Sequence, residues 1–246
     1  MRVVDAESLT RNNLMYREPA LYDELLADEP TTADLLALIK QHHPDARTVL
    51  DLGCGTGRLL ADLHRHGITG SGIDLQPSLI TWAQRTRPRL RLAVGDLRTI
   101  RLGATFDLVT CLGNTLSYLH TDADLAAAFN TIQAHSHPGT LLAIATLTGT
   151  GGHTHGRHEI TTSLGTATAT TTSEWDPNTQ ILTSTRSWRF DTGRVEHDTM
   201  RRRYWSTELL SELTHTAGFE ITTPTPPSLC LSAVRHQPAR RTLEDI

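Results

Sequence analysis

The chain has 246 residues, of which 38% are hydrophobic and 20% are charged, and its formal net charge is −4. This length fits one large domain or one domain with an insertion. The sequence contains no apolar run of the ~18–20 residues that a membrane span requires, and its mild acidity argues against a protein that binds nucleic acid. The polar N-terminus resembles no secretory signal, and the three cysteines show no short pairing pattern. We therefore expect a cytoplasmic protein.

The first 45 residues are predicted to form a helical lid. Tyr16, Leu21 and Leu25 recur at helical spacing, and a second helix begins near Thr31. From residue 46 to residue 146, short apolar segments alternate with amphipathic ones, which predicts a parallel sheet covered by helices on both faces. The expected strands are 48–52, 69–74, 90–94, 106–112 and 140–146, and the expected helices are about 57–66, 77–86 and 122–135.

This alternation ends after residue 146. Residues 147–205 are predicted to form an antiparallel β-insertion, with long alternating segments at about 174–190 and 194–205. Its first part, 147–173, is rich in Thr, Gly and His, and we expect it to be a mobile lid with exposed histidines. His153, His155 and His158 are close enough to suggest zinc, but Cys or acidic partners at regular spacing are missing, so we expect no metal.

The end of the chain completes the predicted sheet. A helix is expected at about 206–217 and ends at Gly218, and two closing strands follow within 219–236. The tail, 237–246, is expected to be frayed. All segments together are expected to form a single domain over residues 1–246.

The candidate site begins with a glycine-rich loop at the end of the first strand. Gly53, Gly55 and Gly57 follow Asp51, so the backbone can pass closely under a ligand while the next helix offers free N–H groups. The spacing is G-x-G-x-G, whereas dinucleotide-binding enzymes use G-x-G-x-x-G. The loop alone therefore disfavours a pyrophosphate ligand.

An acidic residue or a glycine also stands at the end of each of the next three predicted strands. Asp74 ends the second strand, where a carboxylate can accept both hydroxyls of a ribose. Asp96 follows the third strand and can accept from an adenine amino group, and Gly113 follows the fourth. In an open α/β sheet these strand ends meet at one edge, which is where such folds bind ligands.

The segments VLDLGCGTGRL, GIDLQPSLI, VGDLRTI and FDLVTCLGNTLSYL, in this order, resemble the class I S-adenosylmethionine-dependent methyltransferases over roughly residues 20–236. This resemblance implies an α/β fold with a Rossmann-like, seven-stranded, mostly parallel sheet whose last strand is antiparallel. It implies S-adenosylmethionine as cofactor and S-adenosylhomocysteine as product. The cofactor-binding residues that it implies are Tyr16, Asp51, Gly53, Cys54, Gly55, Asp74, Leu75, Gly95, Asp96, Leu97, Cys111, Leu112 and Gly113.

The residues that contact the methyl acceptor are expected after the fourth strand. The tract from Asn114 to Leu119 resembles those of glycine/sarcosine and amino-sugar N-methyltransferases and lacks the Asn/Asp-Pro-Pro-Tyr/Phe signature of enzymes that methylate amide or base nitrogens. Asn114 and Tyr118 are expected at the acceptor, or as support for the loop. Tyr118 and His120 are candidate proton acceptors, although His120 also precedes a helix cap.

The β-insertion is expected to roof the acceptor pocket. Trp188, Arg201 and Arg203 are candidates for acceptor binding, and the two arginines share one face of their strand while Arg202 points the other way. An arginine there would pair with a carboxylate or phosphate. The alternative is a charged strand edge that resists aggregation.

The sequence therefore predicts a methyltransferase that acts on a small molecule, on nitrogen rather than oxygen. All basic residues but Lys40 are arginine, which is typical of GC-rich bacterial genomes and fits secondary metabolism. An O-methyltransferase with a His base or a metal is the enzymatic alternative. A non-catalytic S-adenosylmethionine-binding regulatory protein is the alternative of another class. Neither nucleic acid nor membrane is expected as a partner, and an insertion strand could support a homodimer.

Overall fold

The computed structural model describes residues 5–26 and 31–235. Its centre is a seven-stranded sheet in the order β10-β11-β5-β4-β1-β2-β3, and a separate four-stranded sheet has the order β6-β7-β8-β9. The expected tail, 237–246, and the last residue of the expected closing strand, His236, lie outside the described residues. None of the helices in the described ranges is both long and apolar enough to span a membrane.

The seven-stranded sheet agrees with the expected α/β architecture. All neighbouring pairs from β3 to β5 are parallel, whereas β11 runs antiparallel to both β5 and β10. The last strand is therefore antiparallel, as the resemblance implied. The strands are β1 (Thr48–Leu52), β2 (Thr69–Asp74), β3 (Arg91–Val94), β4 (Phe106–Cys111), β5 (Ser136–Ile144), β10 (Phe219–Ile221) and β11 (Leu231–Arg235).

Helices cover both faces of this sheet because consecutive residues of its strands are apolar and point to opposite faces. Val49 and Leu108 belong to a buried cluster with α4, α5 and α6, and Leu50 and Val109 belong to a second cluster with α7 and α8. These helices are α4 (Thr31–His42), α5 (Arg58–Arg65), α6 (Pro77–Thr86), α7 (Asp122–Ala134) and α8 (Thr207–Thr216). The predicted helices all form, within one or two residues at their ends. The strand expected at 140–146 begins four residues earlier and ends two residues earlier.

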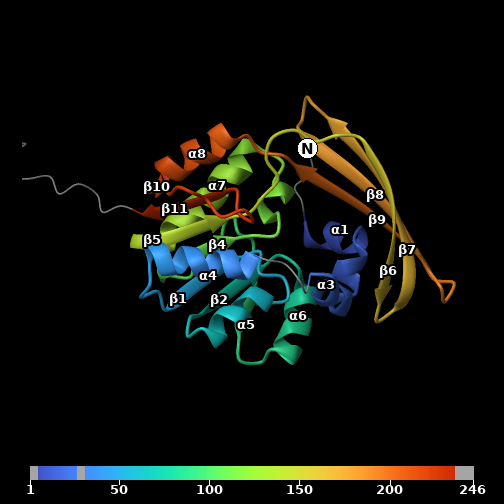
Figure 1. Cartoon of the computed structure of the whole chain (residues 1–246), viewed down its shortest axis with the longest axis horizontal. Coiled ribbons are helices and arrows are strands. Elements are labelled where there is room, and N and C mark those ends of the chain that lie inside the picture. The colour runs from blue at the N-terminus through green and yellow to red at the C-terminus, as the bar shows by residue number, and fades with distance from the viewer. Residues whose placement is uncertain (1–4, 27–30, 236–246) are drawn as a thin grey trace, which may run out of the picture.

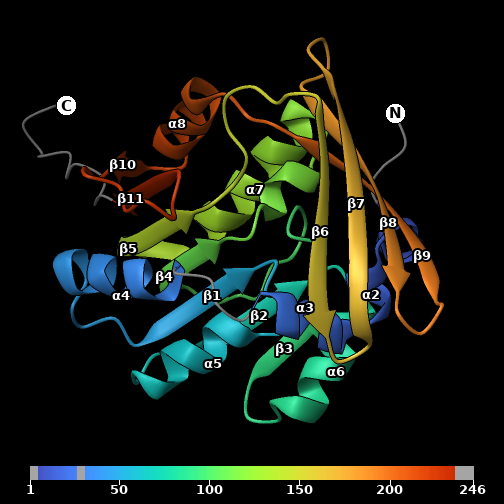
Figure 2. The same cartoon turned by 45° about the vertical axis from the view of Figure 1, so that its right-hand side comes forward.

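Three short helices precede α4. They are α1 (Ala6–Arg11), α2 (Leu14–Arg17) and α3 (Pro19–Leu25). Side-chain oxygens of Asp5 and Asn13 accept the free N–H groups at the starts of α1 and α2, and Pro19 opens α3. Figures 1 and 2 show these helices between the seven-stranded sheet and the four-stranded sheet.

The insertion sheet consists of β6 (Thr154–Thr162), β7 (Gly165–Asp176), β8 (Ile181–Phe190) and β9 (Val195–Arg203), all antiparallel. The expectation of a mobile lid over 147–173 is wrong, since most of this stretch forms β6 and the greater part of β7. β-Branched threonines favour strands, and Ala167 and Ala169 on β7 are buried against Leu14 and Leu21 of the N-terminal helices. The histidines of this stretch are exposed, as expected.

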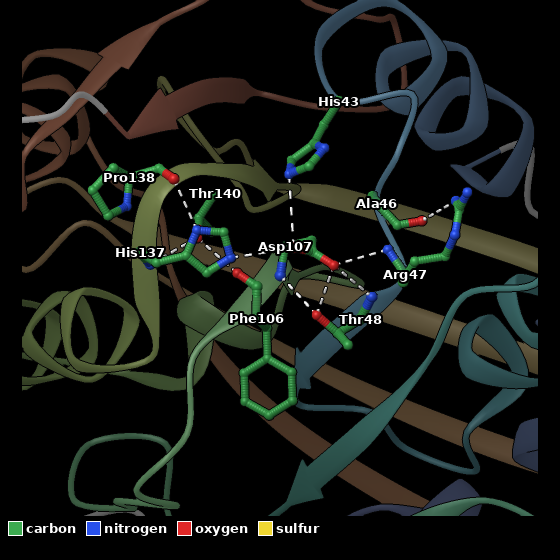
Figure 3. A network of polar contacts seen from close by, with 9 residues as sticks. All are labelled: His43, Ala46, Arg47, Thr48, Phe106, Asp107, His137, Pro138 and Thr140. Carbon is green, nitrogen blue, oxygen red and sulfur yellow. Dashed lines mark hydrogen bonds and ion pairs between the residues drawn. The ribbon is translucent and has the colours of Figure 1, made fainter.

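One polar network ties the amino edge of the seven-stranded sheet together (Figure 3). Asp107, at the start of β4, accepts hydrogen bonds from the backbone N–H of Arg47 at 2.8 Å and of Thr48 at 2.9 Å. Its other oxygen lies 3.2 Å from His137 Nε2 and 3.8 Å from His43 Nε2. Asp107 thus links the starts of β1, β4 and β5 to the end of α4, at the edge opposite the candidate site.

Candidate active site

The carboxyl edge of the sheet opens into a cavity of about 330 Å³ beneath the N-terminal helices. The ends of β1, β2 and β3 and the turn after β4 form its floor, and α1 to α3 cover it. The lining residues include ten of the predicted site residues, namely Tyr16, Gly53, Asp74, Leu75, Gly95, Asp96, Leu97, Gly113, Tyr118 and His120. The strand ends that were expected to meet therefore do meet.

The glycine-rich loop leaves no room for side chains. Gly53 and Gly55 both have positive φ, at 83° and 55°, a conformation that glycine adopts without strain. A Cβ on Gly53 would lie 2.2 Å from Thr115 Oγ1, and one on Gly55 would lie 2.7 Å from the hydroxyl of Tyr22. Glycine is thus required here both by conformation and by the close approach of two neighbouring side chains.

Asp51 lies behind this loop, where it is almost fully buried. Burial raises the pKa of Asp51 to about 7, although a hydrogen bond from the Thr110 hydroxyl (2.7 Å) opposes the shift. Asp51 borders a smaller pocket of about 100 Å³, which Cys54 and Leu112 also line. The two cavities share Tyr22, Gly53 and Gly113. A ligand with a cationic end in the small pocket and a larger body in the main cavity would fit this shape.

Asp74 ends β2 at the cavity wall. Its carboxylate accepts the backbone N–H groups of Gly55 and Gln76, each at 2.8 Å, so it links the glycine loop to the start of α6. Burial raises the pKa of Asp74, and these hydrogen bonds oppose the shift. The Gln76 side chain accepts from the Thr10 hydroxyl of α1 at 2.6 Å, while its Nε2 is buried without a hydrogen-bond partner. An unpaired buried donor beside the Asp74 carboxylate fits the hydroxyls of a ribose.

Asp96 follows β3 and is ion-paired inside the cavity. Arg98 donates to both of its oxygens, at 2.6–3.0 Å, and also reaches Asp124 at 2.9 Å. Burial would raise the pKa of Asp96, but the hydrogen bonds from Arg98 outweigh it and hold the pKa below its ordinary value. Asp96 is therefore a fixed, ionised acceptor at the cavity wall.

Three tyrosines form the wall opposite the strand ends. The ring centroids of Tyr16 and Tyr22 lie 6.2 Å apart, and those of Tyr16 and Tyr118 lie 6.5 Å apart. Burial raises the pKa of the Tyr16 phenol well above its ordinary value, and the nearby phenols of Tyr118 and Tyr22 add to the shift. The Tyr16 phenol is therefore neutral. The faces of the three aromatic rings attract cations such as a sulfonium or an ammonium.

His120 lies at the far end of the cavity, and one of its ring nitrogens is hydrogen-bonded to the protein. Its Nε2 lies 3.0 Å from the backbone carbonyl of Arg201. Since a carbonyl can only accept, Nε2 carries a proton, so in the neutral imidazole Nδ1 is the nitrogen with the lone pair. Burial lowers the pKa of His120, and the cations of Arg201 and Arg203 lower it further. His120 is therefore a neutral imidazole with an available acceptor nitrogen at neutral pH.

The remaining predicted site residues lie outside the main cavity. Cys111 is fully buried in the core. Asn114 adopts the left-handed conformation (φ 64°) that begins the 3-10 turn η1 (Thr115–Tyr118), where asparagine is tolerated. Gly55 lines neither cavity, because Tyr22 covers it. Asn114 thus takes part in the turn after β4, and its role at the acceptor stays a prediction.

The three candidates from the insertion lie away from the cavity as well. Trp188 is fully buried against α2, and its Nε1 donates to Asp198 at 2.6 Å. Arg201 is exposed, and Arg203 stacks on Trp205 (4.2 Å) and pairs with Asp122 (2.8 Å). The strand alternates as predicted, but the arginine on the inner face is the one between them, Arg202.

Sequence reasoning missed six polar or aromatic lining residues, which are Tyr22, Gln76, Arg98, Thr115, Thr121 and Asp124. Gln76 and Arg98 each lie two residues after an acidic strand end, so their position relative to the motifs could have indicated them. Nothing in the local sequence indicates that Tyr22 folds back onto Gly55.

Comparison with known proteins shows which methyltransferases this chain is similar to. Residues 49–139 match the methyltransferase domain family. The dTDP-3-amino-3,6-dideoxy-alpha-D-glucopyranose N,N-dimethyltransferase of Streptomyces fradiae is 36% identical over 112 residues, which are 46% of this chain and 44% of that protein. The cypemycin N-terminal methyltransferase of a Streptomyces species is 34% identical over 133 residues, which are 50% of this chain and 54% of that protein. The chain thus aligns with only about half the length of these curated relatives.

A solved structure resembles the chain over most of its length. It is the SAM-bound amino pentose methyltransferase CalS10 from Micromonospora echinaspora, with a TM-score of 0.73, 27% identity and coverage of 89% of this chain and 93% of that one. The resemblance to S-adenosylmethionine-dependent methyltransferases is therefore confirmed, and S-adenosylmethionine is the cofactor of this class. The glycine loop, the carboxylates of Asp51 and Asp74 and the unpaired Gln76 amide fit that group.

Proposed function

We propose that this methyltransferase transfers methyl groups from S-adenosylmethionine to an amine nitrogen of a small acceptor, of the amino-sugar type, in bacterial secondary metabolism. The observation that carries the proposal is the neutral His120 imidazole, whose Nδ1 lone pair is available at the end of a tyrosine-walled cavity. An amine attacks only as its neutral form, so it needs a base of modest strength that can take one proton. The names of the Streptomyces fradiae relative and of CalS10 support an amino sugar as acceptor.

The cofactor is proposed to lie across both pockets. In this arrangement Asp51 receives the ammonium of the methionine part. Gly53 lies beneath that part together with Cys54, Leu112 and Gly113, and Gly55 shapes the loop under the Tyr22 ring. Asp74 and Gln76 hold the ribose hydroxyls, and Asp96 holds the adenine amino group. The other proposed contacts are Tyr16, Leu75, Gly95, Leu97 and Cys111, the last through the packing of β4.

When bound, S-adenosylmethionine supplies an electrophilic methyl group on a sulfonium. The residues of this chain then have to align the acceptor nitrogen with that methyl group and keep water out, because most of the rate enhancement in such a displacement comes from positioning. The tyrosine wall suits this task, since its rings attract cationic groups and its cover of helices excludes solvent. His120 Nδ1 takes the proton that the acceptor amine must lose.

The test is a methyl-transfer assay with purified protein, S-adenosylmethionine and a panel of acceptors. The panel contains dTDP-3-amino-3,6-dideoxyglucose, the unlinked amino sugar, a peptide with a free N-terminus and a catechol. We expect S-adenosylhomocysteine release and one or two added methyl groups on an amine. Turnover of the catechol alone would establish the O-methyltransferase alternative. Tight cofactor binding without turnover of any acceptor would establish the regulatory alternative.

The cytoplasm is the proposed location, because Cys54, Cys111 and Cys230 are all free thiols. A homodimer stays a prediction. The strands β6 and β9 form the two edges of the insertion sheet, and an edge strand can pair across a two-fold axis. Sedimentation velocity would measure the oligomeric state directly.

A further inference from the structure

His120 lies in the short linker between η1 and α7, and the last residues of β9 contact it at two points. The guanidinium of Arg203 donates from Nη1 to the backbone carbonyl of His120 at 3.2 Å. The backbone carbonyl of Arg201, two residues earlier on the same strand, accepts the His120 Nε2 proton at 3.0 Å. The main chain and the ring of His120 are therefore both bound to β9, so the position of Nδ1 depends on this strand.

The guanidinium of Arg203 is itself fixed by three neighbours. Its central carbon lies 4.2 Å from the centroid of the Trp205 ring, its Nη1 pairs with Asp122 at 2.8 Å, and its Nη2 lies 3.4 Å from Gln180 Oε1. A planar guanidinium that stacks on an aromatic ring has its donors pointing in defined directions. The Arg203 side chain is 16% exposed, so it is not a solvated surface charge.

Trp205 connects this arginine to the turn before the linker. Its ring is fully buried, and its Nε1 donates to the carbonyl of Leu116 in η1 at 2.9 Å. Since η1 ends at Tyr118, Trp205 and Arg203 together contact the segment that brings both Tyr118 and His120 to the main cavity.

Stability alone does not account for an arginine at this place. The Nε of Arg203 is buried and has no hydrogen-bond partner, and an unsatisfied buried donor is destabilising. A largely buried ion pair is also weak evidence for a stabilising role. Among the described residues, those that line the main cavity do not include Arg203, so it has no direct contact with a ligand there. The contact through which it can influence the reaction is the one with His120.

We infer that Arg203 is a positioning residue for methyl transfer, because by holding the carbonyl of His120 it directs Nδ1 of that ring toward the acceptor amine. The inference rests on the proposed function, in which His120 takes the proton. A small misplacement of a reacting group can cost about 100-fold in rate. A residue outside the cavity can therefore set the rate without touching the acceptor. An arginine that bound the acceptor directly would instead act on its KM.

Steady-state kinetics of Arg203→Met, with an amine acceptor and saturating S-adenosylmethionine, tests this role. We expect kcat to fall by about 10- to 100-fold and the KM for the acceptor to change little. The matched control is Arg189→Met, which removes an exposed arginine from β8 and should behave as wild type. The affinity for S-adenosylhomocysteine should stay the same in both variants, which reports that the cofactor site is folded. A higher KM with an unchanged kcat would overturn the inference.

A double variant tests whether Arg203 acts through His120. In the His120→Gln background, Arg203→Met should lower kcat little further, because residues that act as a unit have non-additive effects. Losses that multiply in the double variant would contradict the inference.

The conservative variant Arg203→Lys keeps the positive charge but not the planar guanidinium. We expect its kcat to lie between those of wild type and Arg203→Met. Full activity of Arg203→Lys would show that the charge suffices and that the geometry of the guanidinium has no role, which would also contradict the inference.

The ring of His120 provides a test that needs no turnover. Long-range proton–nitrogen NMR of the imidazole, assigned with His120→Gln, reports which ring nitrogen carries the proton. At a pH of about 8, where the ring is neutral, wild type should carry the proton on Nε2, because the Arg201 carbonyl accepts it. In Arg203→Met we expect a mixture of the two tautomers. The same distribution of tautomers in both proteins would overturn the inference.

The positioning role and the proposed function can fail separately. Methylation of an amine with full kcat in Arg203→Met would leave the proposed function standing and would contradict the positioning role. A His120 tautomer that depends on Arg203, in a protein that methylates no amine, would support the positioning of the ring and would contradict the proposed function.

Discussion

Asp51 carries a buried carboxyl whose pKa is raised to about 7 by burial. A raised pKa means that the folded, unliganded protein favours the protonated form, so the stability this group contributes at low pH is lost as pH rises through about 7. A ligand ammonium instead requires the ionised form. We therefore predict that the affinity for S-adenosylhomocysteine increases as pH rises from about 6 to about 8, and that binding releases a proton in this range.

Calorimetry in two buffers with different ionisation enthalpies measures that proton release. The Asp51→Asn variant should bind more weakly and show no dependence on pH in this range, because the titrating carboxyl is gone. A wild-type affinity that is flat between these pH values would contradict the pairing of Asp51 with the ligand ammonium.

His120 is predicted to set the rate of methyl transfer at neutral pH. The change His120→Gln removes the available Nδ1 acceptor, so we expect kcat for an amine acceptor to fall by about 100-fold. The loss should shrink at high pH, where the amine deprotonates without help. A pH–rate profile of wild type and variant measures this difference. His158→Gln, on the exposed side of β6, is the control and should match wild type. A loss that is equal at every pH would indicate that His120 only shapes the site.

At the scale of elements, Asp198 links the N-terminal helices to the insertion sheet by hydrogen bonds. Its carboxylate binds the Leu14 N–H at the start of α2 and the Trp188 indole at 2.6 Å each. Because α2 also carries Tyr16, we predict that Asp198→Ala loosens the cover of the cavity and weakens S-adenosylhomocysteine binding by about 10-fold or more, the equivalent of one lost charged hydrogen bond.

Hydrogen exchange measures this loosening directly. Amide protection in α1, α2 and α3 should fall in Asp198→Ala, while protection in β1, β4 and β5 should remain. The exposed neighbour Thr199 offers a matched control as Thr199→Ala. Unchanged protection of the N-terminal helices would show that Asp198 does not hold the cover in place.

The elements of the seven-stranded sheet were predictable because each carries a strong local signal. The strands β1 and β4 are buried on both faces and read as continuous apolar runs. The strand β6 lacks such a signal, since most of its residues are exposed and, within residues 5–26 and 31–235, it pairs only with β7. The structure of β6 depends on contacts with β7 and with α3. Because α3 is far away in the sequence, the local sequence of β6 does not predict it.

The same dependence on distant contacts explains why the inward-facing arginine of β9 was not predicted. The alternation of residues 201–203 was correct, but which face turns inward depends on how the whole sheet packs on α2 and η1. The alanines of β7 and Trp188 of β8 fix that face through their contacts with Leu14 and Leu21. These contacts are between residues more than 100 positions apart, so the inward orientation of Arg202 became visible only in the structure.

In the molecule as a whole, the candidate site and the Asp107 network lie at opposite edges of one sheet. The glycine loop, Asp74 and Asp96 lie at the carboxyl edge, whereas the Asp107 network lies at the amino edge (Figure 3). Burial would raise the pKa of Asp107, but hydrogen bonds from Arg47 and Thr48 outweigh it and hold the pKa below its ordinary value. A lowered pKa in the folded state stabilises the protein above the unfolded pKa of about 3.9.

We therefore predict that Asp107→Asn lowers the free energy of unfolding by about 1.5–3 kcal/mol at neutral pH, the range for hydrogen bonds to a charged group. The wild type should lose this advantage as pH falls through the folded-state pKa of Asp107, so the two proteins should converge in acid. Urea unfolding at several pH values measures the difference. Glu7→Gln, which removes a surface pair with Arg11, is the control and should change stability by less than about 1 kcal/mol.

Because Asp107 lies at the far edge, its replacement should leave S-adenosylhomocysteine affinity unchanged under conditions where the variant is folded. A parallel loss of affinity would mean that the two edges are energetically coupled through the strands.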